Sequence, residues 1–254
     1  MSLDTNINDT NKNEEKTNIL GFFKRHYILT GFLIVIIAIT GWWKYQFPSA
    51  TWNYKLTVTV ETPEGIKTGS AVREVYASAH PGFMGVEAKV HHYVQGEAVV
   101  IDMGQGKYLF AIMDVDGSYR IVRDAFPYYE KSDSDYIRHY KSLKESKKSL
   151  LPNQYPTFVT FTDIKDPKTV TLVYGTEFDP ATQQSIKVNR LEELFGAGVK
   201  LRDITIEMTD EDVTHKIDFI ITKDFWNNFD KWWNTLNIQE KSIKANLFNF
   251  KVGE

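Results

Sequence analysis

One uncharged apolar run near the N-terminus constrains this chain more than any other feature. The run covers residues 27–43, and no charged side chain interrupts it. At a rise of about 1.5 Å per residue it would form a helix of about 26 Å, close to the thickness of a bilayer's hydrocarbon core. We therefore predict a transmembrane anchor over residues 21–45, after a polar, disordered cytoplasmic tail over residues 1–20. The anchor side chains are Tyr27, Ile28, Leu29, Phe32, Leu33, Ile34, Val35, Ile36, Ile37, Ile39, Trp42 and Trp43.

The residues before and after the run distinguish a membrane anchor from two other interpretations, a buried core helix and a cleaved signal peptide. Lys24 and Arg25 precede the run, and Trp42 and Trp43 end it, which is the arrangement typical of a membrane span. A signal peptide needs small residues directly after the apolar stretch, whereas residues 41–50 are bulky there. We predict an uncleaved anchor and leave cleavage open.

The distribution of basic residues predicts the orientation of the anchor. More Lys and Arg residues precede the run than follow it within a similar distance, and such residues favour the cytoplasmic side. The N-terminus is therefore expected in the cytoplasm and the rest of the chain outside it. The residues compared are Lys12, Lys16, Lys24 and Arg25 before the run, and Lys44 and Lys55 after it.

Composition excludes several classes of function for the chain beyond the anchor. The formal net charge of the protein is -3, so it lacks the basic excess of a nucleic-acid-binding protein. There is no cysteine, which excludes disulfides, thiolate metal sites and a cysteine nucleophile. No motif for a cofactor occurs, so we expect none.

Two-residue alternation of apolar and polar side chains predicts a β-rich fold beyond the anchor. We expect one α+β domain over residues 50–254, built on an antiparallel sheet (a sandwich, a curved sheet or a barrel) with two or three helices. A subdivision near residue 150 stays open. The expected strands cover residues 54–61, 70–77, 86–94, 98–103, 107–113, 119–122, 157–162, 169–174, 199–208, 215–222 and 247–250.

Three segments carry helical periodicity, at residues 133–150, 188–195 and 224–236. The basic face of the first is expected to be solvated, with contact to anionic lipid or a partner as the alternative. In the third, a stripe of apolar residues predicts core packing, and Trp226 and Trp233 mark a second face. The stripe comprises Phe225, Phe229, Trp232 and Leu236.

Segments that resemble metal or phosphate sites lack the residues that such chemistry needs. His91 and His92 are adjacent in an expected strand, so they point to opposite faces and have no third ligand nearby. Residues 114–118 resemble the opening of a calcium loop without its closing Glu, and a hairpin turn is the better interpretation. Residues 104–107 have the wrong glycine spacing for a phosphate loop, and the acidic residues 210–212 are expected in a solvated turn.

Two places are candidates for contact with a ligand or a partner. A loop with two glycines contains His80, Phe83 and Met84, and binding residues concentrate on such loops. Trp226 and Trp233 could stack on a sugar or dock a partner if exposed, although burial in the core is the simpler expectation.

Several short phrases of the chain resemble a family of uncharacterised single-pass membrane proteins of Gram-negative bacteria. The phrases are TVTVETPEG at residues 57–65, TGS at 68–70, GEAV at 96–99, FGAGVKL at 195–201, and TD with VT within 209–214. The resemblance covers most of the chain beyond the anchor and implies an inner-membrane anchor with a periplasmic domain. It carries no activity and no catalytic residue.

These features lead to three hypotheses of function. The first is a non-enzymatic periplasmic protein, held in the inner membrane, that binds an envelope protein partner or supports an assembly. The second is a domain that binds or senses an envelope glycan or small ligand, as the 14% aromatic content suggests. The third is a hydrolase with scattered catalytic residues, for which Ser70, His80 and nearby acidic residues are weak candidates. The oligomeric state stays open.

Overall fold

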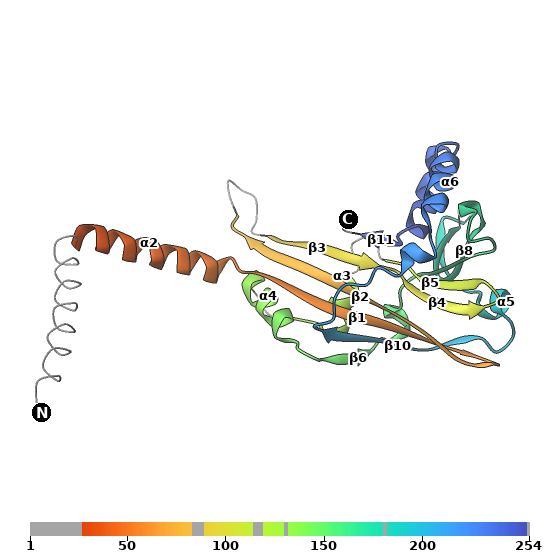
Figure 1. The fold of residues 1–254 in the computed structure, drawn as a ribbon, viewed down its shortest axis with the longest axis horizontal. Helices are drawn as coiled ribbons and strands as arrows, with labels where there is room; N and C mark the ends of the chain where they lie inside the picture. The colour runs from red at the N-terminus through yellow and green to blue at the C-terminus, as the bar shows by residue number, and fades with distance from the viewer. Residues whose placement is uncertain (1–26, 83–88, 114–118, 130–131, 180–181, 253–254) are drawn as a thin grey trace, which may run out of the picture. The chain divides into compact units, whose positions relative to one another are not determined.

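The computed structural model describes residues 27–82, 89–113, 119–129, 132–179 and 182–252. The chain divides into two units after Pro48. The second unit, Ser49–Glu254, contains both β-sheets, and we call it the body (Figure 1).

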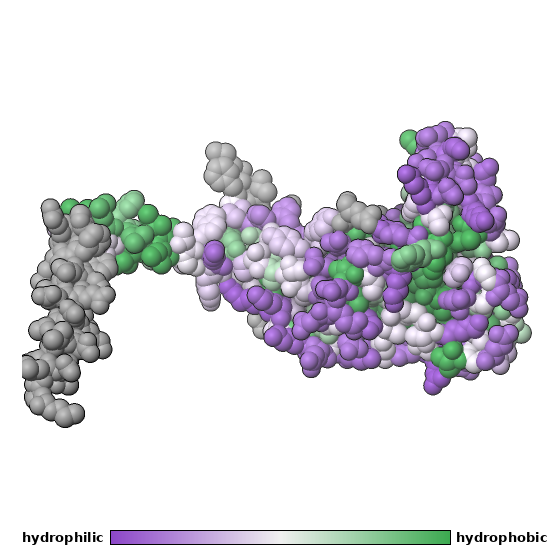
Figure 2. Space-filling view, viewed as in Figure 1, coloured by the Kyte–Doolittle hydropathy of each residue, from purple (hydrophilic) through white to green (hydrophobic). Residues whose placement is uncertain are grey.

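The first unit contains helix α2 (Tyr27–Gln46), which forms where the apolar run predicts it. None of its residues is buried, and Figure 2 shows it covered by hydrophobic side chains. Among the described residues, it is the one helix that is long and apolar enough to cross a membrane. Residues 21–26 of the predicted anchor lie outside the described part of the chain.

The larger sheet of the body has six antiparallel strands in the order β11–β3–β2–β1–β10–β6. Alternation produces its long central strands: Leu56, Val58 and Val60 are buried on one face of β1, and the residues between them are half-buried. The strands are β1 (Ser49–Thr62), β2 (Gly65–His80), β3 (Lys89–Glu97), β6 (Lys147–Ser149), β10 (Lys200–Thr209) and β11 (Lys251–Val252).

The smaller sheet has five antiparallel strands in the order β4–β5–β7–β8–β9. The turn between β4 and β5 places Gln105 at a φ of 55°, so residues 104–107 form a hairpin turn. The strands are β4 (Val99–Gly104), β5 (Lys107–Ala111), β7 (Phe158–Phe161), β8 (Val170–Asp179) and β9 (Gln184–Asn189).

Two hydrophobic clusters of buried residues form the core of the body. Val58 of β1 and Leu109 of β5 belong to one cluster, which lies between the sheets. The next residue of β5, Phe110, belongs to a second cluster with Phe225 and Trp232 of the helix at Lys223–Trp233. The prediction of an α+β, β-rich body with antiparallel sheets is therefore confirmed, and β1–β10 pairing joins its N- and C-terminal halves.

The body contains more helices than the two or three that the sequence predicts. The stripe on α6 packs as predicted, because Phe225 and Trp232 are buried and Phe229 and Leu236 pack beside them. The helices are α3 (Tyr119–Ala125), α4 (Asp133–Ser142), α5 (Leu191–Phe195), α6 (Lys223–Trp233) and α7 (Ile238–Lys244), with 3₁₀ turns η1 (Pro152–Gln154), η2 (Pro167–Thr169), η3 (Ile217–Phe219) and η4 (Ala245–Leu247).

Two predicted strands are helical in the structure. Residues 119–122 begin α3, in which Ile121, Val122 and Ala125 are buried at helical spacing. Residues 215–222 contain η3, whose first amides bind the buried carboxylate of Glu97. β-Branched residues are typical of strands, so both segments resembled strands in the sequence. Burial of one face determines the conformation of α3, and the cap by the distant residue Glu97 determines that of η3.

Three predicted boundaries are also wrong. The helix expected over 133–150 ends at Ser142, and Lys147–Ser149 instead pairs with β10 as β6. The helix expected over 188–195 begins at Leu191, because residues up to Asn189 belong to β9. Leu247 closes a 3₁₀ turn, and the terminal strand begins at Lys251.

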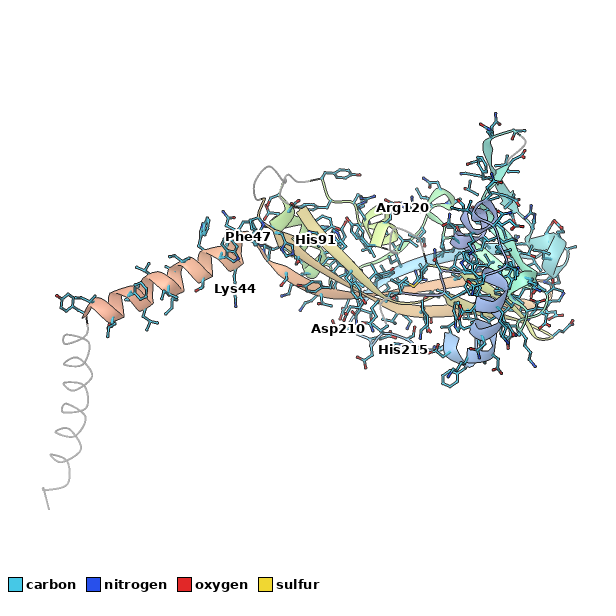
Figure 3. The ribbon with its side chains drawn as sticks, turned by 90° about the horizontal axis from the view of Figure 1, so that it is seen from above. Lys44, Phe47, His91, Arg120, Asp210 and His215 are labelled. Atoms are coloured by element: carbon cyan, nitrogen blue, oxygen red, sulfur yellow. The ribbon has the colours of Figure 1, made fainter. Side chains whose placement is uncertain are left out.

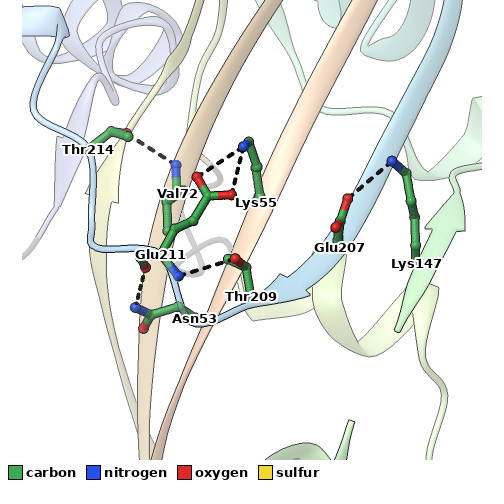
Figure 4. A network of polar contacts seen from close by, with 8 residues as sticks. All are labelled: Asn53, Lys55, Val72, Lys147, Glu207, Thr209, Glu211 and Thr214. Carbon is green, nitrogen blue, oxygen red and sulfur yellow. Dashed lines mark hydrogen bonds and ion pairs between the residues drawn. The ribbon is translucent and has the colours of Figure 1, made fainter. Parts of the chain in front are cut away.

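After β10, the chain crosses the larger sheet from β10 to the far edge of β2 (Figure 4). Lys55 of β1 binds the carboxylate of Glu211 at 2.8 Å. The amide of Val72 in β2 donates to Thr214 Oγ1 at 3.1 Å. The exposed acidic residues 210–212 are therefore part of a crossing segment that is fixed to two strands.

Candidate functional site

Arg73 is the most unusual side chain of the body. It lies on β2 between Ala71 and Val75, and all three are buried on the same face of the strand. Only 1% of Arg73 is exposed, and it is the largest of the fully buried side chains. A guanidinium is charged at all ordinary pH values, so its burial has to be offset by hydrogen bonds or an opposite charge.

The hydrogen bonds of Arg73 go to two backbone carbonyls. Its Nε donates to the Glu97 carbonyl at 2.9 Å, and its Nη2 reaches the Ala111 carbonyl at a long 3.5 Å. Among the described residues, no carboxylate forms an ion pair with it. A guanidinium has five N–H donors, so these two bonds leave most of its binding capacity unused.

The side-chain carboxylate of Glu97, the residue whose carbonyl accepts from Arg73 Nε, already has two hydrogen-bond partners. Glu97 is 1% exposed, and its two oxygens accept the backbone amides of Lys216 and Ile217 at 2.9 and 2.8 Å. The carboxylate therefore caps the start of η3, while only its backbone carbonyl contacts Arg73.

Arg73 lines a cavity of about 430 Å³ in the body. The wall includes Ile112 after β5, Leu172 of β8, and Ser242 and Ile243 of α7. A cavity of this size is within the range that holds small ligands, and its wall combines apolar side chains with at least as many polar ones.

The other charged groups of the wall are of both signs. Arg120 of α3, labelled in Figure 3, and Asp124 both line the cavity. Glu177 of β8 lines it as well and pairs with Arg190 at 2.6 Å. The described residues of the wall therefore carry no large excess of positive charge around Arg73.

A second polar cluster lies under helices α3 and α4, and it is filled by aromatic rings. The His92 ring stacks on Tyr119 at 3.9 Å and meets Tyr136 edge-on at 5.5 Å. Burial, with smaller contributions from Arg123 and His91, lowers the pKa of His92 to about 4. Burial likewise raises the pKa of Tyr136, so the cluster is neutral at pH 7 and we assign it a structural role.

The structure separates the residues of the suggested hydrolase site. Ser70 and His80 lie ten residues apart on the single strand β2, which is about 33 Å at the usual rise. Ser78 instead contacts His80, with 2.7 Å between Oγ and Nε2. Ser78 is buried, and no described carboxylate pairs with His80 to orient its ring, so this pair lacks the third group of a triad.

The structure describes three of the five residues predicted to contact a ligand or partner: His80, Trp226 and Trp233. His80 is exposed at the end of β2, and its ring meets that of His91 at 4.9 Å. Phe83 and Met84 lie outside the described residues. Trp226 and Trp233 are half-buried and pack on Phe229 at 5.6 and 5.1 Å, so they extend the second cluster.

Sequence reasoning missed Arg73, although a signal for it was present. Ala71 and Val75 stand two residues before and after it, so strand alternation places a charged side chain on an apolar face. Among the described residues, no group of three His, Asp or Glu side chains could hold a metal ion.

Comparison with known proteins gives no match: no protein-family model, no curated protein and no solved structure is significantly similar to the chain. The resemblance to single-pass membrane proteins of Gram-negative bacteria therefore stays a prediction from the sequence.

Proposed function

We propose that this protein is a membrane-anchored binding protein whose body takes up a small ligand in the Arg73 cavity. The observation that carries the proposal is a buried guanidinium that lines a cavity and has no carboxylate partner among the described residues. Such an arrangement is costly for stability alone, and a ligand that binds the guanidinium gives it a function.

In this proposal, α2 holds the body at the bacterial inner membrane, with the N-terminus in the cytoplasm and the body in the periplasm. The length of α2 and the lack of buried residues in it support the anchor, and the basic residues before it support the orientation. Binding without chemistry is supported by the separation of Ser70 from His80. Docking of an envelope protein partner, the first of the three hypotheses from the sequence, stays a prediction.

Native mass spectrometry of the full chain, released gently from its membrane, tests ligand binding. Ser242 is exposed and lines the cavity, so Ser242→Trp should obstruct the cavity without altering buried residues, and Ser242→Ala is the matched control. We expect a small-molecule adduct on the wild type and on Ser242→Ala that is absent from Ser242→Trp. Bare protein in all three samples, or the same adduct on all three, would contradict the proposal.

A further inference from the structure

The chemistry around Arg73 also defines the class of ligand. Resting on the proposed function, we infer that the cavity binds a small organic carboxylate, whose charged group pairs with the Arg73 guanidinium and whose apolar part lies along the apolar residues of the wall.

The negative charge of the ligand follows from the bonding of Arg73. Its two described hydrogen bonds go to neutral carbonyl groups, and the Nη2 bond is long at 3.5 Å. The buried carboxylate of Glu97 is bound to the amides of η3. A planar guanidinium binds a carboxylate through two parallel hydrogen bonds. A ligand carboxylate bound in this way would use N–H donors of Arg73 that have no described partner.

The other charged residues of the cavity wall indicate that the ligand carries a single negative charge. Among the described residues at the wall, Arg120 offsets the charge of Asp124, and Arg190 pairs with Glu177. The charge of Arg73 is then left to be balanced, and a dianion such as a phosphate monoester would bring one negative charge more than this balance needs. One carboxylate, bound to one arginine, fits this balance better.

The apolar part of the ligand follows from the other wall residues. Ile112, Leu172, Phe178 and Ile243 line the cavity. Burial of apolar surface against such residues contributes binding free energy in proportion to the area removed from water.

Three probes of the same shape test the inference: 4-phenylbutyrate, 4-phenylbutanol and 4-phenylbutylamine. Their binding to the full chain in nanodiscs is measured by calorimetry, with empty nanodiscs as the blank. We expect the carboxylate to bind about 10- to 100-fold more tightly than the alcohol, which is typical of a charged hydrogen-bonded pair. The amine should bind most weakly, because the ammonium repels Arg73.

Two variants connect this preference to Arg73. Arg73→Gln should bring the affinities of carboxylate and alcohol close together, whereas Arg202→Gln, at an exposed arginine of β10, should keep the wild-type preference. If Arg73→Gln does not fold, Ser242→Trp replaces it and should weaken all three probes, while Ser242→Ala should not.

The outcomes separate this inference from the proposed function. Equal binding of the three probes, lost in Ser242→Trp, would overturn the carboxylate inference and leave a ligand-binding cavity. A preference for the carboxylate that survives Arg73→Gln would also overturn it. Absence of binding by all three probes would contradict the proposed function as well.

Discussion

Gly96 of β3 lies directly against the side chain of Arg73, and a Cβ atom at Gly96 would come within 2.7 Å of Arg73 Cγ. Gly96 also has a φ of 151°, a conformation that other residues adopt only with strain. Gly96→Ala should therefore displace Arg73, lower the affinity for 4-phenylbutyrate and destabilise the body by about 3 kcal/mol. Calorimetry and urea unfolding measure the two effects.

Gly65 provides the matched control for this prediction. Its φ is 127°, but a Cβ there would meet nothing within 4 Å. Gly65→Ala should cost about 1 kcal/mol through backbone strain and leave the affinity unchanged. Equal loss of affinity in both variants would show that Gly96 does not act by making room for Arg73.

The buried cap at Glu97 should matter more for stability than the exposed ion pair at Glu211. Glu97→Gln replaces one of two buried acceptors of backbone amides and should cost about 2–3 kcal/mol. Glu211→Gln weakens an ion pair in which the side chain of Lys55 is 30% exposed and that of Glu211 is 56% exposed. Its loss should cost about 1 kcal/mol or less. Urea unfolding of both variants checks the order, and the reverse order would refute the assignment of the cap.

His92 should make the body less stable in acid. Its pKa is lowered to about 4 in the folded protein from the 6.5 of an ordinary histidine, so the unfolded chain binds the proton more readily between these pH values. The contribution of neutral His92 to the free energy of unfolding is complete above pH 6.5 and is lost as the pH falls to about 4. Because His92 is only partly buried, we expect a loss of about 1–2 kcal/mol.

Two variants isolate this effect in unfolding curves measured from pH 7 to pH 4. His92→Phe keeps a ring beside Tyr119 and removes the titrating group, so this part of the decline should disappear. His91→Phe retains His92 and should keep most of the decline, because burial is the larger cause of the lowered pKa of His92 and His91 a smaller one. A decline of the same size in both variants would assign it to other groups.

The absence of cysteine allows a clean test of orientation. A cysteine at exposed His215, labelled in Figure 3, should react with a membrane-impermeant maleimide in cells with a permeabilised outer membrane. A cysteine at Asn8 should react only after the inner membrane is lysed. The opposite pattern would place the body in the cytoplasm.

Strands were more predictable from this sequence than short helices, for a physical reason. Leu56, Val58 and Val60 alternate over a long strand, and a period of two is the repeat of strand geometry and not of a helix. Ile121 and Ile217 belong to helical turns of a few residues, which are too short to establish a period. Their conformation depends on burial and, for η3, on Glu97, which is far away in the chain.

The candidate site was less predictable, because it depends on tertiary contacts. Alternation places Arg73 on the inner face of a strand, yet a partner for it could have stood anywhere in the chain. Ala111 and Ser242 come close to Arg73 or its cavity only through the packing of the sheets and α7. No local spacing in the sequence encodes such a cavity.

The Nε–Hε resonance of Arg73, in the ¹⁵N-arginine-labelled full chain, tests the central claim most directly. Its absence from the spectrum of Arg73→Gln identifies it. We predict that this resonance shifts saturably with 4-phenylbutyrate, much less with 4-phenylbutanol, and not at all in Ser242→Trp. A stationary Arg73 resonance at concentrations of 4-phenylbutyrate that saturate binding would contradict the account.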